Sequence, residues 1–476
     1  MQRQPPRSAR EPHGVAKDSE NQAGRPAPTQ DGCIRRRGET IEISSVRTNT
    51  VGESDEVSGD VLHCAQRLRG IVQPYSWGSR TALADLTGRT SPSEEPEAEL
   101  WLGAHPNGPS VLQCGASLAE AISRSPKAAL GPESLSRFGE QLPFLFKVLA
   151  AESALSLQAH PTREQARAGF ASENAAGIPV DSPVRNYRDD NHKPELLVAL
   201  TEFHALAGFR DVPTTVALIR DLRVAALVGF AEELSAGGLR DVFEKWLKLG
   251  ESDAAALLSA LVEGCERYLD ERPAGDFADE VETLIDLAEQ YPGDSGVLAA
   301  LLLNRLTLNP GEGIYLDAGH LHAYVHGTGI EVMANSDNVL RGGMTEKNID
   351  RDELMRVLRF DPIAPPIVRA DPLADSSWNA VILHYPTPAP EFRLRRVEID
   401  GGRAVGSDGA RNYARGPQIL LCTKGTCRIT IENAEVIGSQ REFVVAQGES
   451  IWVPAGATVG FASVGADSQV FIAAGT

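Results

Sequence analysis

The segment Gly311-Glu-Gly-Ile-Tyr-Leu-Asp317-Ala-Gly319-His-Leu-His322 decides the fold, because its pattern returns later in the chain. The second copy is Gly448-Glu-Ser-Ile-Trp-Val-Pro454-Ala-Gly456-Ala-Thr-Val459. Both copies fit Gly-x5-(Asp/Pro)-x-Gly-x2-x, in which an apolar strand leads into a tight turn at the second glycine. The repeat therefore predicts the same strand and turn at two places.

This pattern resembles the second sequence motif of the cupins, whose last position is a metal-binding histidine. The resemblance implies at least two jelly-roll barrels, one with His322 at the ligand position and one with Val459 there. Val459 and Phe461 at a spacing of two, after Ile451 and Val453, indicate a second barrel that is filled by apolar side chains.

The C-terminal unit, which begins near Asp371, has no histidine after His384. A histidine-based metal site cannot be built there from local residues, so we expect this unit to bind no metal. We expect it to cover the back of the catalytic barrel and to fix the loops that hold Arg341 and Lys347.

Composition narrows the class of protein. The 476 residues carry 46 Lys and Arg against 65 Asp and Glu, a net charge of −19, which disfavours binding to nucleic acid through broad basic patches. No apolar run approaches the ~20 residues of a membrane-spanning helix. Six cysteines make no disulfide framework, and the pair Cys422 and Cys427 lacks the CxxC spacing of a metal or redox site. We therefore expect a cytoplasmic protein that binds neither nucleic acid nor membranes.

The residue composition and the hydrophobic pattern change along the chain. The first residues have many charges and no aromatic side chain before Tyr75, which predicts a disordered extension. Strand-like runs such as 153–160 then dominate, helical patterns such as 295–303 follow, and strands return after Pro310. We predict four parts: a disordered extension at 1–62, a catalytic cupin domain at 63–211 and 304–370, a helical domain at 212–303, and a metal-free C-terminal cupin domain at 371–476. The fold class is mainly β with an α insertion.

Polar residues alternate with apolar ones in the run from Leu155 to Pro161. If this run is a strand, Ser156, Gln158 and His160 share one face. That face either supplies two metal ligands or simply meets water as an ordinary amphipathic strand.

A second polar run, from Asp189 to Leu196, opens another apolar strand. Lys193 and Glu195 are two residues apart, and Pro194 favours an extended Lys193, so the two side chains share a face. Glu195 suits a metal ligand, and Lys193 suits an acid, a base or a phosphate contact. A charged turn in water explains the two residues equally well.

A third polar run lies between Glu331 and Lys347. Arg341 and Lys347 suit an anionic ligand, because arginine offers a planar fork and lysine a point charge. A surface loop is the alternative. In the preceding turn, the spacing of His320 and His322 does not decide which of the two faces a site, and the cupin register favours His322.

Together these runs resemble the type I phosphomannose isomerases. The resemblance spans about 400 residues from Leu68 onward. It rests on Tyr75–Gly78, Glu97–Pro106, Leu142–Leu149, Leu155–Pro161, Asn191–Glu195, His322–Tyr324, Ala334–Asn338 and Arg341–Gly343.

The resemblance implies a bicupin with a helical insertion and an isomerase that interconverts mannose 6-phosphate and fructose 6-phosphate through an enediol. The family's catalytic arginine falls on Arg341. The family's zinc ligands, for one Zn²⁺ per chain, fall on Gln158, His160, Glu195 and His322. Leu321 and Glu346 stand where proline is usual, beside the functional residues rather than on them.

The reaction moves a proton between C1 and C2, so it needs a base within hydrogen-bond reach. Lys193, His192, Glu331 and Asp337 all remain open for that role. We expect Ser156 and Lys347 to hold the phosphate and Arg341 to stabilise the enediolate. The expected partner is a small sugar phosphate, and the chain is expected to be a monomer or a weak homo-oligomer.

Two other functions compete with this prediction. A cupin oxygenase would need a redox metal with open coordination, and the chain lacks a two-histidine, one-carboxylate triad within one short motif. A sugar-binding regulator would normally carry a DNA-binding appendage, and no basic recognition helix is visible in the helical block.

Overall fold

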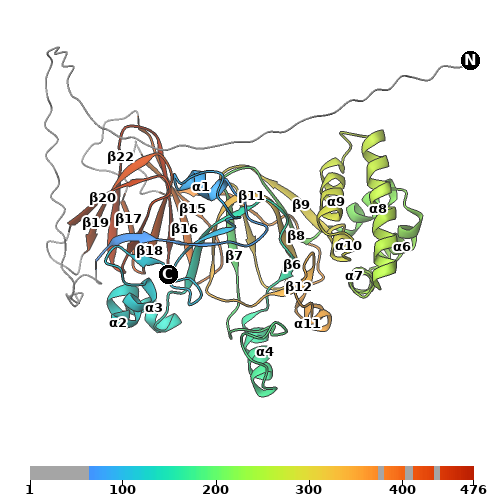
Figure 1. Cartoon of the computed structure of the whole chain (residues 1–476), viewed down its shortest axis with the longest axis horizontal. Coiled ribbons are helices and arrows are strands. Elements are labelled where there is room, and N and C mark those ends of the chain that lie inside the picture. Colours follow the sequence, from blue (N-terminus) through green and yellow to red (C-terminus); the bar gives the residue numbers. More distant parts are fainter. Residues whose placement is uncertain (1–63, 374–379, 402–410, 434–439, 476) are drawn as a thin grey trace, which may run out of the picture. The chain divides into compact units, whose positions relative to one another are not determined.

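The computed structural model describes residues 64–373, 380–401, 411–433 and 440–475. They form one compact unit that is mainly β, with twenty-three strands in three antiparallel sheets and with helices added (Figure 1). No sheet closes on itself through the pairings of these strands. The predicted disordered extension at 1–62 lies outside the described residues.

The eleven-stranded sheet is organised around one long strand, β11 (His322–Ala334). The first half of β11 pairs with β6 (Leu157–Ala159) and β8 (Phe203–Phe209), and the second half pairs with β5 (Phe144–Ala151) and β7 (Glu195–Ala199). The other strands of this sheet are β2 (Ile71–Gln73), β3 (Glu99–Leu102), β9 (Leu303–Leu308), β10 (Gly313–Leu316), β12 (Leu340–Gly343) and β13 (Ile367–Val368).

Between the two halves, β11 needs a glycine. Gly327 has φ 120°, and a Cβ at this position would lie 2.6 Å from the carbonyl oxygen of Glu202. Only glycine accepts both the positive φ and the close backbone contact. The chain can therefore change partners at this residue, from β6 and β8 to β5 and β7.

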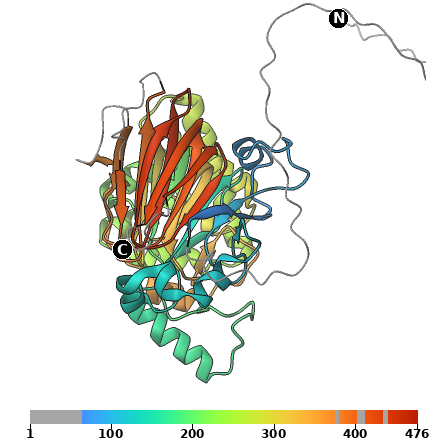
Figure 2. The same cartoon turned by 90° about the vertical axis from the view of Figure 1, so that its left-hand side faces the viewer.

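The other two sheets come mostly from the C-terminal region, and their strands dominate the view in Figure 2. The eight-stranded sheet also takes in β1 (Gln66–Arg69) and β4 (Val111–Leu112), since β1 pairs with both β4 and β21 (Ser450–Val453). The remaining strands are β14 (Asp371–Pro372), β15 (Ala380–Tyr385), β16 (Arg393–Ile399), β18 (Gln418–Lys424) and β23 (Ser468–Ala474), with β17 (Arg411–Ala414), β19 (Thr426–Asn433), β20 (Gln440–Ala446) and β22 (Ala457–Ser463) in the four-stranded sheet.

The two copies of the repeat have the same local structure. In each copy a four-residue strand, β10 or β21, leads into a turn and a longer strand. Gly319 (φ 79°) and Gly456 (φ 77°) occupy the turns, where a left-handed backbone favours glycine. Val459 is fully buried and belongs to an apolar cluster with Phe461 and Ile451. The predicted apolar interior of the second copy is therefore present.

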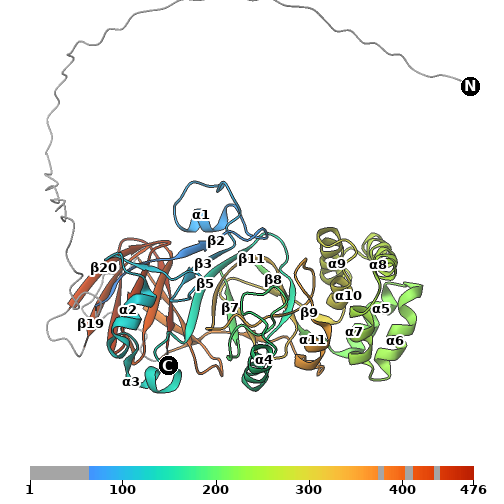
Figure 3. The same ribbon diagram turned by 60° about the horizontal axis from the view of Figure 1, so that its bottom comes forward.

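Helices occupy the chain between β8 and β9 (Figure 3). Apolar residues at helical spacing bury one face of each long helix; in α8 these include Leu258, Leu261 and Cys265. None of the described helices is long and apolar enough to cross a membrane. They are α5 (Val212–Asp221), the 3-10 helix η2 (Ala225–Leu227), α6 (Val228–Ser235), α7 (Leu239–Leu247), α8 (Glu251–Glu271), α9 (Ala278–Gln290) and α10 (Gly296–Ala300).

Two predicted elements are shorter than expected. The helix predicted at 295–303 ends at Ala300, because Leu303 already pairs with Phe209 as the first residue of β9. The strand predicted at 153–160 is reduced to β6. Ala154 is held instead by the helical block, since its backbone N–H donates to Gln290 and its carbonyl accepts from Tyr291.

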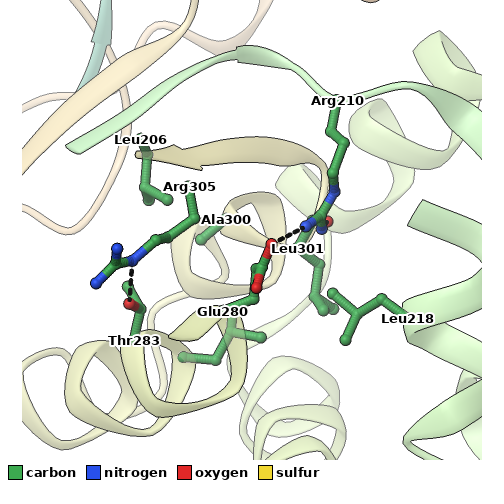
Figure 4. A pocket seen from close by; sticks show the side chains of 9 residues that line it. Leu206, Arg210, Leu218, Glu280, Thr283, Ala300, Leu301 and Arg305 are labelled. Carbon is green, nitrogen blue, oxygen red and sulfur yellow. Dashed lines mark hydrogen bonds and ion pairs between the residues drawn. The ribbon is translucent and has the colours of Figure 1, made fainter. Parts of the chain in front are cut away.

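A small cavity lies between these helices and strands β8 and β9 (Figure 4). Arg210 lies 3.2 Å from Glu280, and Arg305 Nε donates to Thr283 Oγ1 at 3.3 Å. The charged groups of the cavity already have partners in the protein, so we assign no ligand to it.

The remaining helices lie outside this block. Thr162 and Gln165 form a capping box at the start of α4, directly after the polar run that ends at Pro161. This cap fixes the point at which the chain leaves β6. These helices are α1 (Ala82–Leu86), α2 (Leu118–Arg124), α3 (Pro126–Phe138), α4 (Arg163–Ala175) and α11 (Arg351–Val357).

Candidate active site and metal centre

Three buried side chains from different strands converge beside β11. His160 follows β6, Glu195 begins β7 and His322 begins β11. His160 Nε2 lies 3.4 Å from Glu195 Oε1, and His322 Nε2 lies 3.5 Å from Glu195 Oε2. One ligand atom from each residue lies within 4.8 Å of the others. This is a set of donors around one point.

Main-chain carbonyls orient both histidine rings. His160 Nδ1 lies 2.7 Å from the carbonyl oxygen of Asn338, and His322 Nδ1 lies 3.0 Å from that of His320. A carbonyl can only accept, so each Nδ1 carries the proton and each Nε2 presents a lone pair toward Glu195. Burial lowers the pKa of His160 to about 4, which keeps this ring neutral.

The converging atoms have no hydrogen-bond partner in the part of the chain that the structure describes. His160 Nε2, His322 Nε2 and Glu195 Oε2 are buried and form no hydrogen bond with any described residue. Buried polar atoms without partners are costly. Two imidazole nitrogens and a carboxylate suit zinc, and the donors therefore fit the ion that the sequence predicts.

Gln158, the fourth predicted ligand, lies next to this group. It is the middle residue of β6, between the buried Leu157 and Ala159. Its register partners are His322 on one side and Arg341 on the other. The strand thus brings Arg341 to the edge of the metal centre.

Lys193 meets Glu195 as their spacing suggests. Lys193 Nζ lies 2.8 Å from Glu195 Oε1, and both side chains are buried. Burial alone would raise the pKa of Glu195, but the charge of Lys193 and contacts with the histidines hold it well below its usual value. Glu195 is therefore a carboxylate.

A second buried charge cluster adjoins the first. Lys147 Nζ lies 2.8 Å from Glu331 Oε2 and 3.5 Å from Glu99 Oε1. Tyr324 donates to Glu331 Oε1 at 3.0 Å, and Trp101 Nε1 donates to Glu99 Oε2 at 2.6 Å. Both carboxylates already have partners, so Glu331 is enclosed within an ion-pair network.

Asp337 lies in the loop between β11 and β12. Its side chain is 35% exposed, and its Oδ1 lies 3.2 Å from Nε2 of the buried His105. Burial raises the pKa of Asp337, but the hydrogen bond from His105 and the charge of Lys193 lower it to a net value below the usual range. This residue is an ionised carboxylate beside the site.

His192, another predicted base, faces the C-terminal region. Its Nε2 lies 2.8 Å from Glu391 Oε1, and the same oxygen accepts from Arg163 at 2.5 Å. Glu391 is only 1% exposed. The C-terminal region thus reaches the active-site loop through one buried carboxylate.

Three cations gather on the other side of the loop. Burial and the positive charges of Arg341 and Arg188 lower the pKa of Lys347. Among the described residues, none pairs with these three side chains. Ser156, the other predicted phosphate contact, is half-buried before β6, and no described hydrogen bond joins it to them.

The helical segment contacts the loop after β12. The backbone N–H of Thr345 donates to Asp294 Oδ2 at 3.2 Å. A Cβ on Gly343 (φ 139°) would lie 2.4 Å from the Cα of Gly296. Only glycine permits this close approach.

This chain is similar to known proteins. A family model described as phosphomannose isomerase type I, catalytic domain, matches residues 65–212. The mannose-6-phosphate isomerase of Salmonella typhimurium is 38% identical over 399 residues, which cover 82% of this chain and 95% of that protein. The chain belongs to the mannose-6-phosphate isomerase family.

Two further comparisons support this family membership. The mannose-6-phosphate isomerase of Escherichia coli is 39% identical over 366 residues, or 76% of this chain and 89% of that protein. The crystal structure of the Salmonella typhimurium mannose 6-phosphate isomerase bound to substrate (F6P) and zinc has a TM-score of 0.73 and 35% identity, over 87% of this chain and all of that chain. The resemblance noted from the motifs is confirmed.

Several residues of this mannose-6-phosphate isomerase family member escaped the sequence reasoning. Glu99 and Lys147 are charged residues inside otherwise apolar strands, and that contrast was a usable signal. His105 lies within one of the motifs listed above and Arg188 lies beside another. No spacing relates His105 to Asp337, or Arg188 to the other two cations, because these residues are distant in sequence.

Proposed function

We propose that this chain is a metal-dependent aldose–ketose isomerase that interconverts mannose 6-phosphate and fructose 6-phosphate through an enediol intermediate. The observation that carries the proposal is the convergence of three unpartnered donor atoms, from His160, Glu195 and His322, beside an unpaired cation group. Family membership, including a relative whose structure is described as bound to F6P and zinc, supports the same reaction.

His160, Glu195, His322 and Gln158 would hold one Zn²⁺. Zinc in this position would supply Lewis-acid polarisation of a sugar oxygen. Lys193 neutralises Glu195 and adds positive charge to the same corner of the site. Positive charge there stabilises an enediolate relative to the neutral sugar.

Arg341 and Lys347 divide the substrate's two anionic groups between them. We assign the enediolate to Arg341, because its strand position opposite Gln158 brings it to the metal centre. Lys347 takes the phosphate with Ser156, and Arg188 adds a third positive charge to that side. These three cations have no partner among the described residues and repel one another, and a bound phosphate would relieve this repulsion.

Asp337 is the base we favour among the four predicted ones. Glu331 is paired with Lys147, His192 with Glu391 and Lys193 with Glu195. One oxygen of Asp337, by contrast, has no described partner. Asp337 would take the proton from C2 of the aldose and return it to C1. A proton also passes from the C2 hydroxyl to the C1 oxygen, so no atom is gained or lost.

The finer architecture follows the family. We propose that the eleven-stranded sheet belongs to a catalytic cupin barrel at 63–211 and 304–370, and that residues 371–476 form a second, metal-free barrel. The helices at 212–303 would be an insertion within the catalytic domain, between its two parts. We further propose a cytoplasmic enzyme that is a monomer or a weak homo-oligomer and binds neither nucleic acid nor membranes.

One assay tests this function. Purified protein is given mannose 6-phosphate, and fructose 6-phosphate is measured before chelation, after chelation and after zinc is added back. We expect formation, loss and recovery of product in that order. A zinc-loaded, folded protein that forms no fructose 6-phosphate would contradict the proposal.

A further inference from the structure

His105 is a buried histidine whose purpose is not explained by packing alone. It follows β3 and is 3% exposed, with its ring edge-on to Trp101 at a centroid distance of 4.8 Å. The backbone N–H of Asn107 donates to His105 Nδ1 at 3.2 Å. This bond makes Nδ1 the acceptor, so the proton of the neutral ring lies on Nε2.

Nε2 of His105 points at one oxygen of Asp337. The 3.2 Å distance between Nε2 and Oδ1 places a donor on this carboxylate. The backbone N–H of Asp337 is held at the same time by Asp189 Oδ2, at 2.7 Å. Both the side chain and the main chain of Asp337 are therefore fixed by residues that are distant in sequence.

The following residue, Asn338, connects the loop of Asp337 to the metal centre. The carbonyl oxygen of Asn338 lies 2.7 Å from Nδ1 of His160. The residue next to Asp337 in the chain therefore contacts His160, a predicted metal ligand. Its second carboxylate oxygen, Oδ2, has no hydrogen-bond partner among the described residues, and the side chain remains 35% exposed.

We propose that His105 is a positioning residue that holds Asp337 in place for proton transfer, an inference that rests on the function proposed above. His105 occupies Oδ1 and leaves Oδ2 to accept the proton of the substrate. A carboxylate that is free to rotate would spend less time within hydrogen-bond reach of C1 and C2. His105 therefore raises kcat without touching the substrate.

A purely structural role makes a different prediction. If His105 only fills space against Trp101, a phenylalanine would serve almost as well, and any loss would not depend on Asp337. If the bond to Asp337 matters, a glutamine would serve better than a phenylalanine, because its amide nitrogen can take the place of Nε2. Two substitutions thus separate ring packing from hydrogen bonding.

The test is a double-mutant cycle on the full chain with zinc bound. His105→Phe, His105→Gln, Asp337→Asn and His105→Phe with Asp337→Asn are assayed with mannose 6-phosphate, and zinc is measured in each. The control is His204→Gln, which alters a partly exposed histidine that contacts Glu202. We expect the control to keep wild-type kcat in both backgrounds.

We expect Asp337→Asn to lower kcat by about 10²- to 10⁴-fold, as for the loss of a general base. His105→Phe should lower kcat by about 10- to 100-fold with unchanged zinc content and a small change in KM. His105→Gln should recover most of the loss. In the Asp337→Asn background, His105→Phe should have no further effect.

Three results would overturn the inference: wild-type kcat in His105→Phe, a loss that multiplies with that of Asp337→Asn, or a glutamine no better than phenylalanine. Should His105→Phe fail to fold, His105→Leu replaces it as the variant without a hydrogen-bond donor, and the same three results overturn the inference. If wild-type protein forms no fructose 6-phosphate, the proposed function fails instead.

Discussion

Lys147 and Glu331 form a buried ion pair at 2.8 Å on adjacent strands, where their Cα atoms are direct register partners across β5 and β11. Glu99 lies 3.5 Å from the same ammonium group. The charges of the two carboxylates outweigh burial and raise the pKa of Lys147. One lysine thus serves as the shared counter-charge of two buried carboxylates.

Removing this lysine should destabilise the fold. Lys147→Met leaves two carboxylates buried without a counter-charge, so we expect the free energy of unfolding to fall by about 3–5 kcal/mol. Urea denaturation measures the change. Lys245→Met is the matched control, because Lys245 pairs with Glu233 at the surface and should contribute less than about 1 kcal/mol. Equal effects of the two variants would contradict this account of the cluster.

Arg341 should act in the chemical step. Arg341→Lys keeps the charge but loses the planar two-point contact, and we expect kcat to fall by about 10- to 100-fold with zinc content unchanged. Steady-state kinetics with mannose 6-phosphate give kcat and KM separately. A change that appears only in KM would assign Arg341 to the phosphate and remove its role at the enediolate.

Arg188 should act on binding. It is exposed, so screening by solvent limits its contribution to about 1 kcal/mol, or about a fivefold rise in KM for Arg188→Gln. The rise should shrink as salt is added, while kcat stays unchanged. Arg124→Gln, an exposed arginine at the end of α2, serves as the control. A rise in KM that does not depend on salt would argue against an electrostatic contact.

Glu391 should give a pH-dependent contribution to stability. Although burial raises its pKa, contacts with His192 and Arg163 lower it to a net value below the usual 4.5 of a glutamate. A carboxyl whose pKa is lower in the folded state stabilises the protein at pH values above its unfolded-state pKa. This stabilisation is lost as the pH falls through the folded-state pKa.

The Tm difference between wild type and Glu391→Gln should therefore be largest above about pH 5 and shrink below about pH 4.5. Thermal unfolding from pH 4 to pH 8 measures it, and Glu289→Gln, on the exposed side of α9, should show no such trend. A difference that does not vary with pH would mean that Glu391 contributes through packing rather than charge.

Local patterns in the sequence predicted much of this architecture. The repeat at Gly311 and Gly448 predicted the strand–turn–strand units, since glycine is the residue most favoured in a turn with positive φ. Alternation in the run before Pro161 placed Gln158 between buried neighbours, and the spacing of Lys193 and Glu195 predicted their contact. These signals are local, and local backbone geometry decides them.

Contacts between distant segments were not predictable in this way. His105 and Asp337 are 232 positions apart by their residue numbers, and no periodicity relates them. Pairing of β1 with β21 joins the start of the described chain to its C-terminal region. The strand at 153–160 was overestimated because Gln290 and Tyr291 compete for the backbone of Ala154. In each case tertiary packing overrides the local preference.

A zinc titration of metal-free protein tests the central claim most directly. Fructose 6-phosphate formation from mannose 6-phosphate is followed as zinc is added to a known concentration of chain. We predict that activity rises in proportion to zinc, saturates at one ion per chain, and is absent at every zinc level in His322→Ala, whereas His326→Ala, on the exposed side of β11, titrates like wild type. Saturation near two ions per chain, or full activity without metal, would contradict a single zinc held by His160, Glu195 and His322.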